Sequence, residues 1–181
     1  NTAVGYHALK LNTSGSSNVS VGRESMVNNT TGTANAVLGA GALNANTEGD
    51  YNTAVGSMAL NLNTTGANNT ATGFEALKAN TTGSYNTALG RRALDANTTG
   101  SYNVSLGRDS LGSNTTADAN VAVGNAALFA NTTGANNVGI GYDALNANTT
   151  GASNVALGAY SLDANTTADN NVAIGKLALT T

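Results

Sequence analysis

Residues 52–68 read NTAVGSMALNLNTTGAN, and residues 69–85 read NTATGFEALKANTTGSY. Both stretches follow one 17-residue unit, which opens with asparagine and has glycine at its fifth position. The unit repeats without a slip along all 181 residues, as ten copies and part of an eleventh. A fixed short period is typical of a stacked repeat array, so it predicts a solenoid. The asparagines that open the units are Asn1, Asn18, Asn35, Asn52, Asn69, Asn86, Asn103, Asn120, Asn137, Asn154 and Asn171.

The array shows no internal boundary, so we expect one continuous repeat region over residues 1–181. The sequence starts and stops within the repeat, without polar capping units and without a visible signal peptide. We therefore expect an excerpt of a longer fibre, whose targeting segment lies elsewhere.

The composition argues against several functional classes. Charged residues make up only 9% of the chain and the net charge is -3, so we expect no nucleic-acid partner. The absence of cysteine excludes disulfides and thiolate metal sites. No run of about 18 apolar residues occurs, so we expect no membrane insertion. We also expect no cofactor.

Each unit, numbered here from 1 to 17, contains a strand signal. Positions 2 to 4 carry β-branched or small residues between turn residues, which predicts a strand. Gly at position 5 allows the backbone to bend. Positions 8 to 11 are expected to form a second short strand, in which Leu at position 9 and Ala at position 11 share a face. The Asn-Thr-Thr-Gly segment at positions 12 to 15 has the chemistry of a turn.

The fold class that we predict is an all-β, single-stack parallel β-solenoid. The chain has no Asn-Gly, Asp-Gly or Gly-Gly pair, and these are the preferred two-residue hairpin turns. Coils stacked at about 4.8 Å would form a rod roughly 50 Å long. Asparagine at positions 1 and 12 would then form two structural ladders, with each amide bonded to its equivalent in the next coil.

The strand at positions 2 to 4 lacks polar alternation, which is typical of a strand buried on both faces. With position 3 facing the core, positions 2 and 4 would expose an apolar strip on the order of 500 Å². We therefore expect a homotrimer around an axis lined by this strip. The alternative is a monomer with positions 2, 4 and 9 all inside. The predicted interface residues at position 4 are Val4, Val21, Leu38, Val55, Leu89, Leu106, Val123, Ile140, Leu157 and Ile174.

The repeat resembles two known families. Asn-Thr-Ala-Val-Gly-Tyr-His-Ala-Leu at residues 1–9, followed by Asn-Thr-Ser-Gly at residues 12–15, looks like the repeats of phage-type tail-fibre proteins. The Asn-x-Ala-Val/Ile-Gly core is also similar to the head repeats of trimeric autotransporter adhesins, which are parallel β-rolls with somewhat shorter coils. The resemblance covers the whole chain. It implies an extracellular fibre, at a cell surface or on a virion, that extends and adheres.

Few residues suggest chemistry, and we expect no enzyme. His7 is the only histidine and lies at a variable position, which indicates a surface residue. Glu75, Arg92 and Asp109 occupy position 7 of three consecutive coils, which predicts charge pairing between neighbouring coils rather than a glycosidase pair. Asp118 and Asp169 are three coils apart, so they cannot share a metal ion.

Three further interpretations remain open. The threonines at positions 13 and 14 could bind ice, although adjacent residues of a strand point to opposite faces. Tyr51, Tyr85 and Tyr102 at position 17 could contact sugars, or pack between coils or chains. Asn-Thr-Thr is an N-glycosylation acceptor sequence, although turn chemistry explains it as well. The acceptor asparagines are Asn29, Asn63, Asn80, Asn97, Asn114, Asn131, Asn148 and Asn165.

The function that we expect is a structural and adhesive extracellular fibre segment. Its partners would be copies of itself, as a homotrimer or filament, and a surface glycan or other receptor bound at the variable positions 6, 7, 10, 16 and 17. A homopolymeric structural filament without a receptor is the alternative, followed by an ice-binding solenoid.

Overall fold

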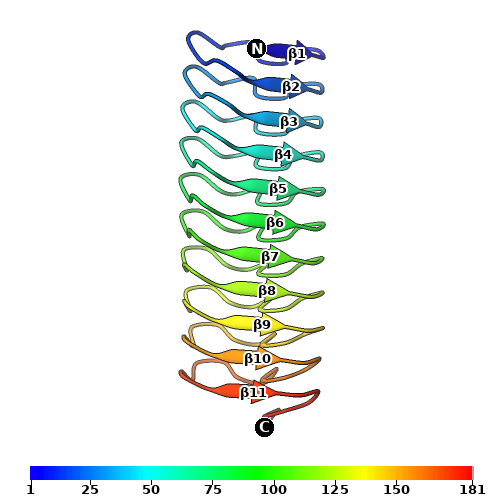
Figure 1. Cartoon of the computed structure of the whole chain (residues 1–181), viewed down its shortest axis with the longest axis vertical. Helices are drawn as coiled ribbons and strands as arrows, with labels where there is room; N and C mark the ends of the chain where they lie inside the picture. The colour runs from blue at the N-terminus through cyan, green and yellow to red at the C-terminus, as the bar shows by residue number, and fades with distance from the viewer. Residues whose placement is uncertain (181) are drawn as a thin grey trace.

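In the computed structural model the chain is a straight rod of stacked coils, with its two ends far apart (Figure 1). The structure describes residues 1–180, so Thr181, the last residue of the predicted array, lies outside the described part. Each coil contributes one strand of three residues. The strands are β1 (Thr2–Val4), β2 (Val19–Val21), β3 (Ala36–Leu38), β4 (Thr53–Val55), β5 (Thr70–Thr72), β6 (Thr87–Leu89), β7 (Val104–Leu106), β8 (Val121–Val123), β9 (Val138–Ile140), β10 (Val155–Leu157) and β11 (Val172–Ile174).

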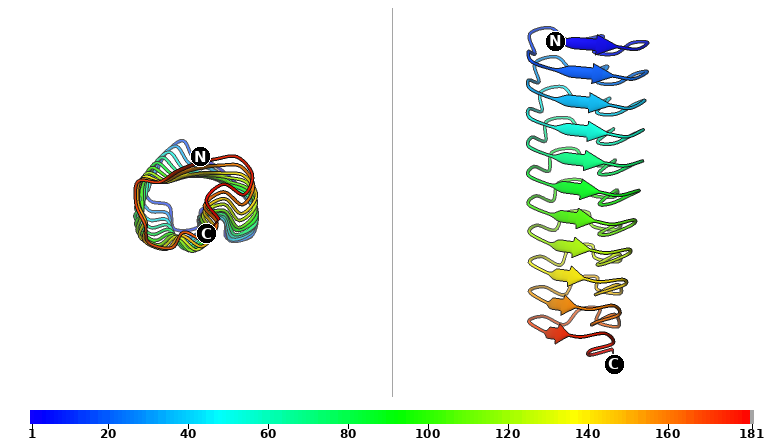
Figure 2. Two further views of the ribbon diagram at one scale, coloured as in Figure 1. Left: turned by 90° about the horizontal axis from the view of Figure 1, so that it is seen from below. Right: turned by 45° about the vertical axis from the view of Figure 1, so that its right-hand side comes forward.

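The strands form one parallel sheet in chain order, β1 to β11. Each residue pairs with its equivalent one unit later, as Thr53 does with Thr70 and Ala54 with Ala71. The predicted parallel β-solenoid with one coil per 17-residue unit is therefore confirmed. Figure 2 shows that successive coils are turned slightly against one another around the axis of the rod.

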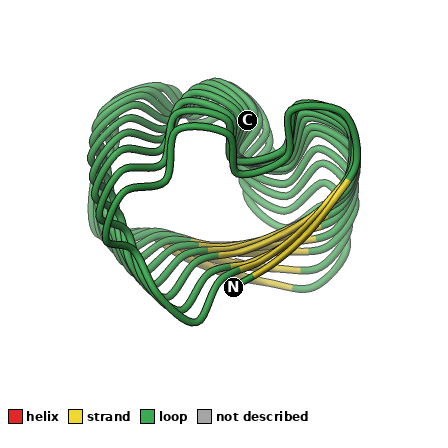
Figure 3. Ribbon diagram, turned by 90° about the horizontal axis from the view of Figure 1, so that it is seen from above, coloured by secondary structure: helices red, strands yellow, loops and turns green. Residues whose placement is uncertain are grey.

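The predicted second strand at positions 8 to 11 is wrong. This stretch is a series of turns, and the view along the rod shows strand on one side of the coil only (Figure 3). In β5's coil, for example, Glu75 at position 7 and Leu77 at position 9 have left-handed φ angles of 57° and 52°. An extended strand cannot contain such residues. The turns nevertheless stack between coils, because the Leu77 N–H donates to the Ala93 carbonyl at 2.9 Å.

This curled backbone also changes which residues share a face. Ala76 and Leu77 are adjacent in the chain, yet both are fully buried. The restriction of position 8 to Ala or Ser follows, because that side chain lies in the narrow interior beside leucine. The prediction that position 11 shares the face of position 9 is wrong, because Ala79 is half-exposed and Leu62 is 46% exposed.

The core is a column of position-9 side chains packed against the small residues of the sheet. Leu60, Leu77 and Leu94 are fully buried, and so are Ala54 and Ala71 on the inner face of the strands. A coil of this size has room for one large side chain only opposite a small one, which explains the small residue at position 3.

Glycine at position 5 is required by close contact between coils. Gly73 has a φ of +134°, and a Cβ there would lie 2.5 Å from the Gly90 carbonyl oxygen of the next coil. Both the positive φ and this contact exclude a side chain without a backbone shift. The sheet therefore ends at the same place in every coil.

Two asparagine ladders line the interior, as predicted. At position 12, the Nδ2 group of Asn80 donates to Asn63 Oδ1 at 2.7 Å and to the Gly83 carbonyl at 2.9 Å. At position 1, Asn69 Nδ2 donates to the same Gly83 carbonyl at 2.9 Å, and Asn69 Oδ1 accepts the backbone N–H of Asn86 at 2.9 Å. Among the described residues, no buried side-chain nitrogen or oxygen lacks a hydrogen-bond partner.

Candidate functional surface

The outer face of the sheet is the most extended candidate surface. In each strand the middle residue points inward and the two flanking residues point outward. In β6, for example, Ala88 is 1% exposed whereas Leu89 is 51% exposed. The same alternation places Leu38, Ile140 and the other position-4 side chains outside. We call the outward residues at positions 2 and 4 of β1 to β11 the apolar stripe.

The apolar stripe carries no charged residue in any coil. Val, Leu and Ile occupy 16 of its 22 positions, so it is mainly apolar, and the coil of β5 carries threonine at both positions. The remaining members are Ala36, Thr2, Thr53, Thr70, Thr72 and Thr87. All ten predicted interface residues, from Val4 to Ile174, lie on this stripe and are exposed or half-exposed. The alternative with positions 2 and 4 inside the coil is therefore wrong, while association through the stripe stays a prediction.

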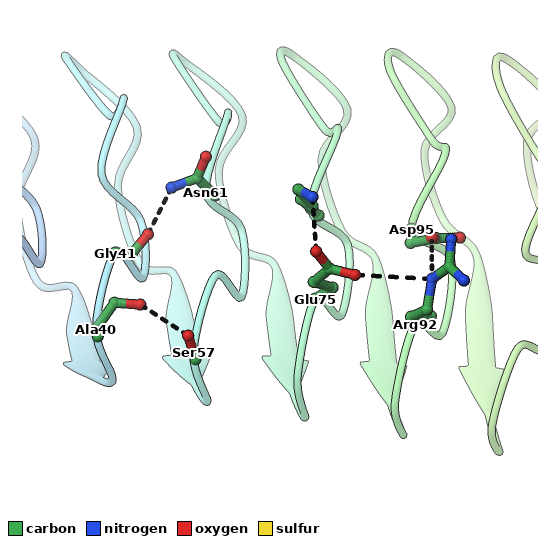
Figure 4. Close-up of polar contacts among 8 residues, drawn as sticks. Ala40, Gly41, Ser57, Asn61, Glu75, Arg92 and Asp95 are labelled. Atoms are coloured by element: carbon green, nitrogen blue, oxygen red, sulfur yellow. Dashed lines mark hydrogen bonds and ion pairs between the residues drawn. The ribbon is translucent and has the colours of Figure 1, made fainter.

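The charged residues at position 7 form part of a second surface (Figure 4). Arg92 Nε lies 3.7 Å from Glu75 Oε2 in the preceding coil, which confirms the predicted pairing between those two. Arg92 Nε also donates to Asp95 Oδ2 at 3.1 Å. The predicted pairing of Arg92 with Asp109 is wrong, because Asp109 pairs with the adjacent Arg108 at 3.2 Å. Side chains within one turn reach each other more easily than side chains one coil apart.

The Asp95 carboxyl group in this cluster has a raised pKa. Only 17% of its side chain is exposed, and this burial raises its pKa above the ordinary value of 3.8. The Arg92 guanidinium opposes the shift by favouring the charged form, while Asp109 and Glu75 add to it.

A pocket of about 430 Å³ opens beside this cluster. It was not predicted from the sequence. Its lining includes Gly112 and Phe129, which occupy position 10 of consecutive coils. The available signal in the sequence was Gly112, because all the other residues at position 10 have a side chain.

The threonine columns serve different purposes. At position 13, Thr81 Oγ1 donates to the Thr98 carbonyl of the next coil at 3.0 Å, and most other coils repeat this bond. At position 14, Thr82 and its equivalents are exposed. The two hydroxyl columns therefore do not form one flat double row of free hydroxyls, as ice binding by these columns would need.

The acceptor sequences for N-glycosylation lie in the interior. Seven of the asparagines, from Asn29 to Asn148, are fully buried, and Asn165 is half-buried. Their amides form the position-12 ladder, so a glycan on any of the seven would break the folded coil. Turn and ladder chemistry thus accounts for the repeated Asn-Thr-Thr.

Exposed aromatic side chains stack along the rod. The rings of Tyr85 and Tyr102 are parallel, with centroids 5.1 Å apart and an interplanar angle of 2°. Each ring therefore covers one face of the other, which supports packing between coils. His7 is half-buried and stacks on Tyr6 with centroids 3.8 Å apart.

Within residues 1–180 there is no group of three or more His, Asp or Glu side chains placed to hold a metal ion. The described part also contains no helix long and apolar enough to cross a membrane. Comparison with protein-family models, with curated proteins and with solved structures finds no match to this chain.

Proposed function

We propose that the rod is a structural and adhesive segment of an extracellular fibre, at a cell surface or on a virion. In this proposal three copies associate around an axis lined by the apolar stripe. The variable residues on the remaining surface contact a receptor. The observation that supports the proposal is the uncharged, exposed stripe along β1 to β11.

The size of the stripe favours association. Eleven coils stacked at about 4.8 Å, with two columns of side chains about 7 Å apart, give an apolar area on the order of 500 Å². The largest apolar patch of a typical soluble monomer is about 300–600 Å², and a patch of that size is often an interaction site. Its members include Leu38 at 54% exposed, Leu89 at 51% and Ile140 at 40%, so a large part of each side chain remains to be buried.

The regularity of the rod favours a symmetric partner. Every coil presents the same two columns at the same height, so a second copy aligned along the rod matches the stripe coil by coil. Cyclic symmetry closes such an assembly without leaving a further apolar surface exposed. The rod also suits an extending fibre, because each coil contacts only its neighbours and added units lengthen it.

Sedimentation equilibrium of two aspartate variants tests the proposal. Val123→Asp places a carboxylate on the stripe, in a column where Thr72 already shows that a polar side chain is accommodated. We expect this variant to be monomeric and folded, because three buried carboxylates at the axis cannot be paired.

Ser84→Asp is the matched control. Ser84 Oγ accepts the Ala67 N–H at 3.0 Å, and Asp118 at the same repeat position accepts the Ser101 N–H at 2.7 Å. The control adds the same charge off the stripe and should remain trimeric. Equal masses for the two variants would contradict the proposal. Open-ended polymers would favour the filament alternative, and thermal hysteresis of the same samples would favour ice binding.

A further inference from the structure

The pocket beside Arg92 lies where a polar contact found in three other coils is missing. In those coils, asparagine at position 10 donates its amide to the position-7 carbonyl of the preceding coil. Asn61 Nδ2 donates to the Gly41 carbonyl at 2.7 Å, and Asn146 donates to the Ala126 carbonyl at 3.1 Å. Figure 4 shows this contact for Asn61.

Gly112 and Phe129 replace that donor in two consecutive coils. The carbonyls that would accept it belong to Arg92 and Asp109. Among residues 1–180, no hydrogen bond reaches either of these two oxygens. Both residues line the pocket, so the interruption leaves two backbone acceptors beside an open space of about 430 Å³. Such a volume lies within the range of about 300–1,000 Å³ that is typical of small-molecule sites.

Phe129 supplies an aromatic wall. Its side chain is 42% exposed, and its ring lies over Gly112, where an added Cβ would be only 3.0 Å from Phe129 Cε2. The ring therefore occupies the space that a position-10 side chain would fill. A partly exposed ring beside a set of polar groups suits a ligand with one apolar face and one polar edge.

The ionic groups around the pocket are largely paired with one another. Three acidic and three basic side chains form the ion pairs of this cluster, and the charges within this paired set cancel. Figure 4 shows that the two terminal nitrogens of Arg92 lie on the side of the guanidinium that faces away from Glu75. The hydrogen bond of Arg92 to Asp95 uses Nε instead. The paired residues are Glu75, Lys78, Arg92, Asp95, Arg108 and Asp109.

We propose that this pocket binds a neutral saccharide unit, stacked on Phe129 and hydrogen-bonded to Arg92, Asp109 and Ser113. Sugar hydroxyls both donate and accept, which matches carboxylate and carbonyl acceptors next to guanidinium and hydroxyl donors. The C–H face of a sugar ring matches the aromatic wall. This inference rests on the adhesive part of the proposed function and names its ligand class. A single pocket binds weakly, and association of several chains multiplies the contact with a glycan surface.

Fluorine NMR provides the test, because the chain contains only two phenylalanines. The protein is labelled with 4-fluorophenylalanine, and Phe74→Leu identifies which signal belongs to Phe129. Methyl glycosides of glucose, galactose, mannose and N-acetylglucosamine are titrated in turn. We expect at least one of them to shift the Phe129 signal in a saturable manner and to leave the Phe74 signal in place.

Gly112→Asn is the decisive variant. It introduces the residue that other coils carry at this position, as Asn44, Asn61 and Asn146, so it should preserve the fold. Its side chain displaces the movable ring of Phe129, fills the pocket and returns a donor to the Arg92 carbonyl. We expect it to abolish the shift, with circular dichroism unchanged. The inference is overturned if no glycoside moves the Phe129 signal, if both signals move together, if Gly112→Asn still responds, or if inorganic phosphate shifts the signal more than every glycoside.

The same labelled protein separates this inference from the fibre assembly. Val123 lies on the apolar stripe and not in the pocket, so Val123→Asp should become monomeric and still bind the glycoside. Loss of trimers with retained binding would count against the assembly alone. Intact trimers without any glycoside response would count against the pocket alone.

Discussion

Asn80 donates a hydrogen bond from Nδ2 to Oδ1 of Asn63, one coil earlier, at 2.7 Å. Asn80 Oδ1 in turn accepts Nδ2 of Asn97 at 2.9 Å, so each amide in the ladder both donates and accepts. This chain of amides is fully buried. It holds neighbouring coils at one spacing and satisfies polar groups that water cannot reach, which a coil with so little apolar core requires.

Asn80→Ala should therefore destabilise the rod strongly. It leaves Oδ1 of Asn63 without a donor in the interior, and such a buried orphan costs about 1–3 kcal/mol. Asn97 Nδ2 loses one of its two acceptors and keeps the Gly100 carbonyl at 2.9 Å. We expect the free energy of unfolding in urea to fall by about 2–3 kcal/mol. Thr82→Ala, an exposed site two residues away, should change it by less than about 0.5 kcal/mol. Equal effects would show that the ladder does not stabilise the stack.

The leucine column can be tested with one substitution at two sites. Leu94 at position 9 is fully buried, whereas Leu62 at position 11 is 46% exposed. Leu94→Ala should lower the free energy of unfolding by about 2–5 kcal/mol, because it removes buried methyl groups and leaves a cavity. Leu62→Ala should cost much less. A larger loss for Leu62→Ala in thermal or urea unfolding would contradict the placement of position 9 in the core.

Glycine to alanine substitutions should separate two kinds of glycine. Gly73→Ala introduces a Cβ at a φ of +134° and 2.5 Å from the Gly90 carbonyl oxygen. We expect a melting temperature several degrees lower. Gly112→Ala meets mainly the movable ring of Phe129, at 3.0 Å, and has no positive φ, so its melting temperature should stay close to that of the unmodified chain. Similar shifts for the two variants would contradict this distinction.

Asp95→Asn should change how stability depends on pH. Burial raises the pKa of Asp95 in the folded chain above its ordinary value of 3.8, so the folded state binds this proton more tightly than the unfolded state. The stabilising contribution of the protonated carboxyl is fully present below pH 3.8 and is lost as pH rises through the folded pKa. The unmodified chain should therefore gain stability relative to Asp95→Asn as the pH falls from 7 to about 3.5.

Thermal unfolding of both proteins at the two pH values measures that difference. Asp163→Asn, at the same repeat position in a distant coil, is the control for removal of a carboxylate outside the charged cluster. A difference between Asp95→Asn and the unmodified chain that does not vary with pH, or varies in the opposite sense, would exclude the assigned effect of burial.

Much of this fold could be predicted because the repeat shows, at each of its 17 positions, which residue types occur there in all coils. Asparagine at positions 1 and 12 and glycine at position 5 occur wherever those positions occur, and each has one structural reason: an amide ladder or a carbonyl too close for a side chain. The alternation within the strand, with position 3 inward and position 4 outward, followed from residue size alone.

The turns at positions 8 to 11 could not be predicted, because the local backbone opposes residue propensity. Leu77 adopts a left-handed conformation that costs a residue with a side chain roughly 1–2 kcal/mol. Hydrogen bonds to the neighbouring coils and burial of the leucine side chain hold it there, and neither is visible within a single unit. The pocket was not predicted for a related reason. Gly112 lines it only together with Arg92 and Phe129, which belong to the coils on either side.

The mass of the unmodified chain in solution, measured by sedimentation equilibrium over a wide range of concentrations, tests the central claim most directly. A stripe that copies of the chain cover predicts a stable species of three times the chain mass of 17.8 kDa. A single species of 17.8 kDa at every concentration would contradict it.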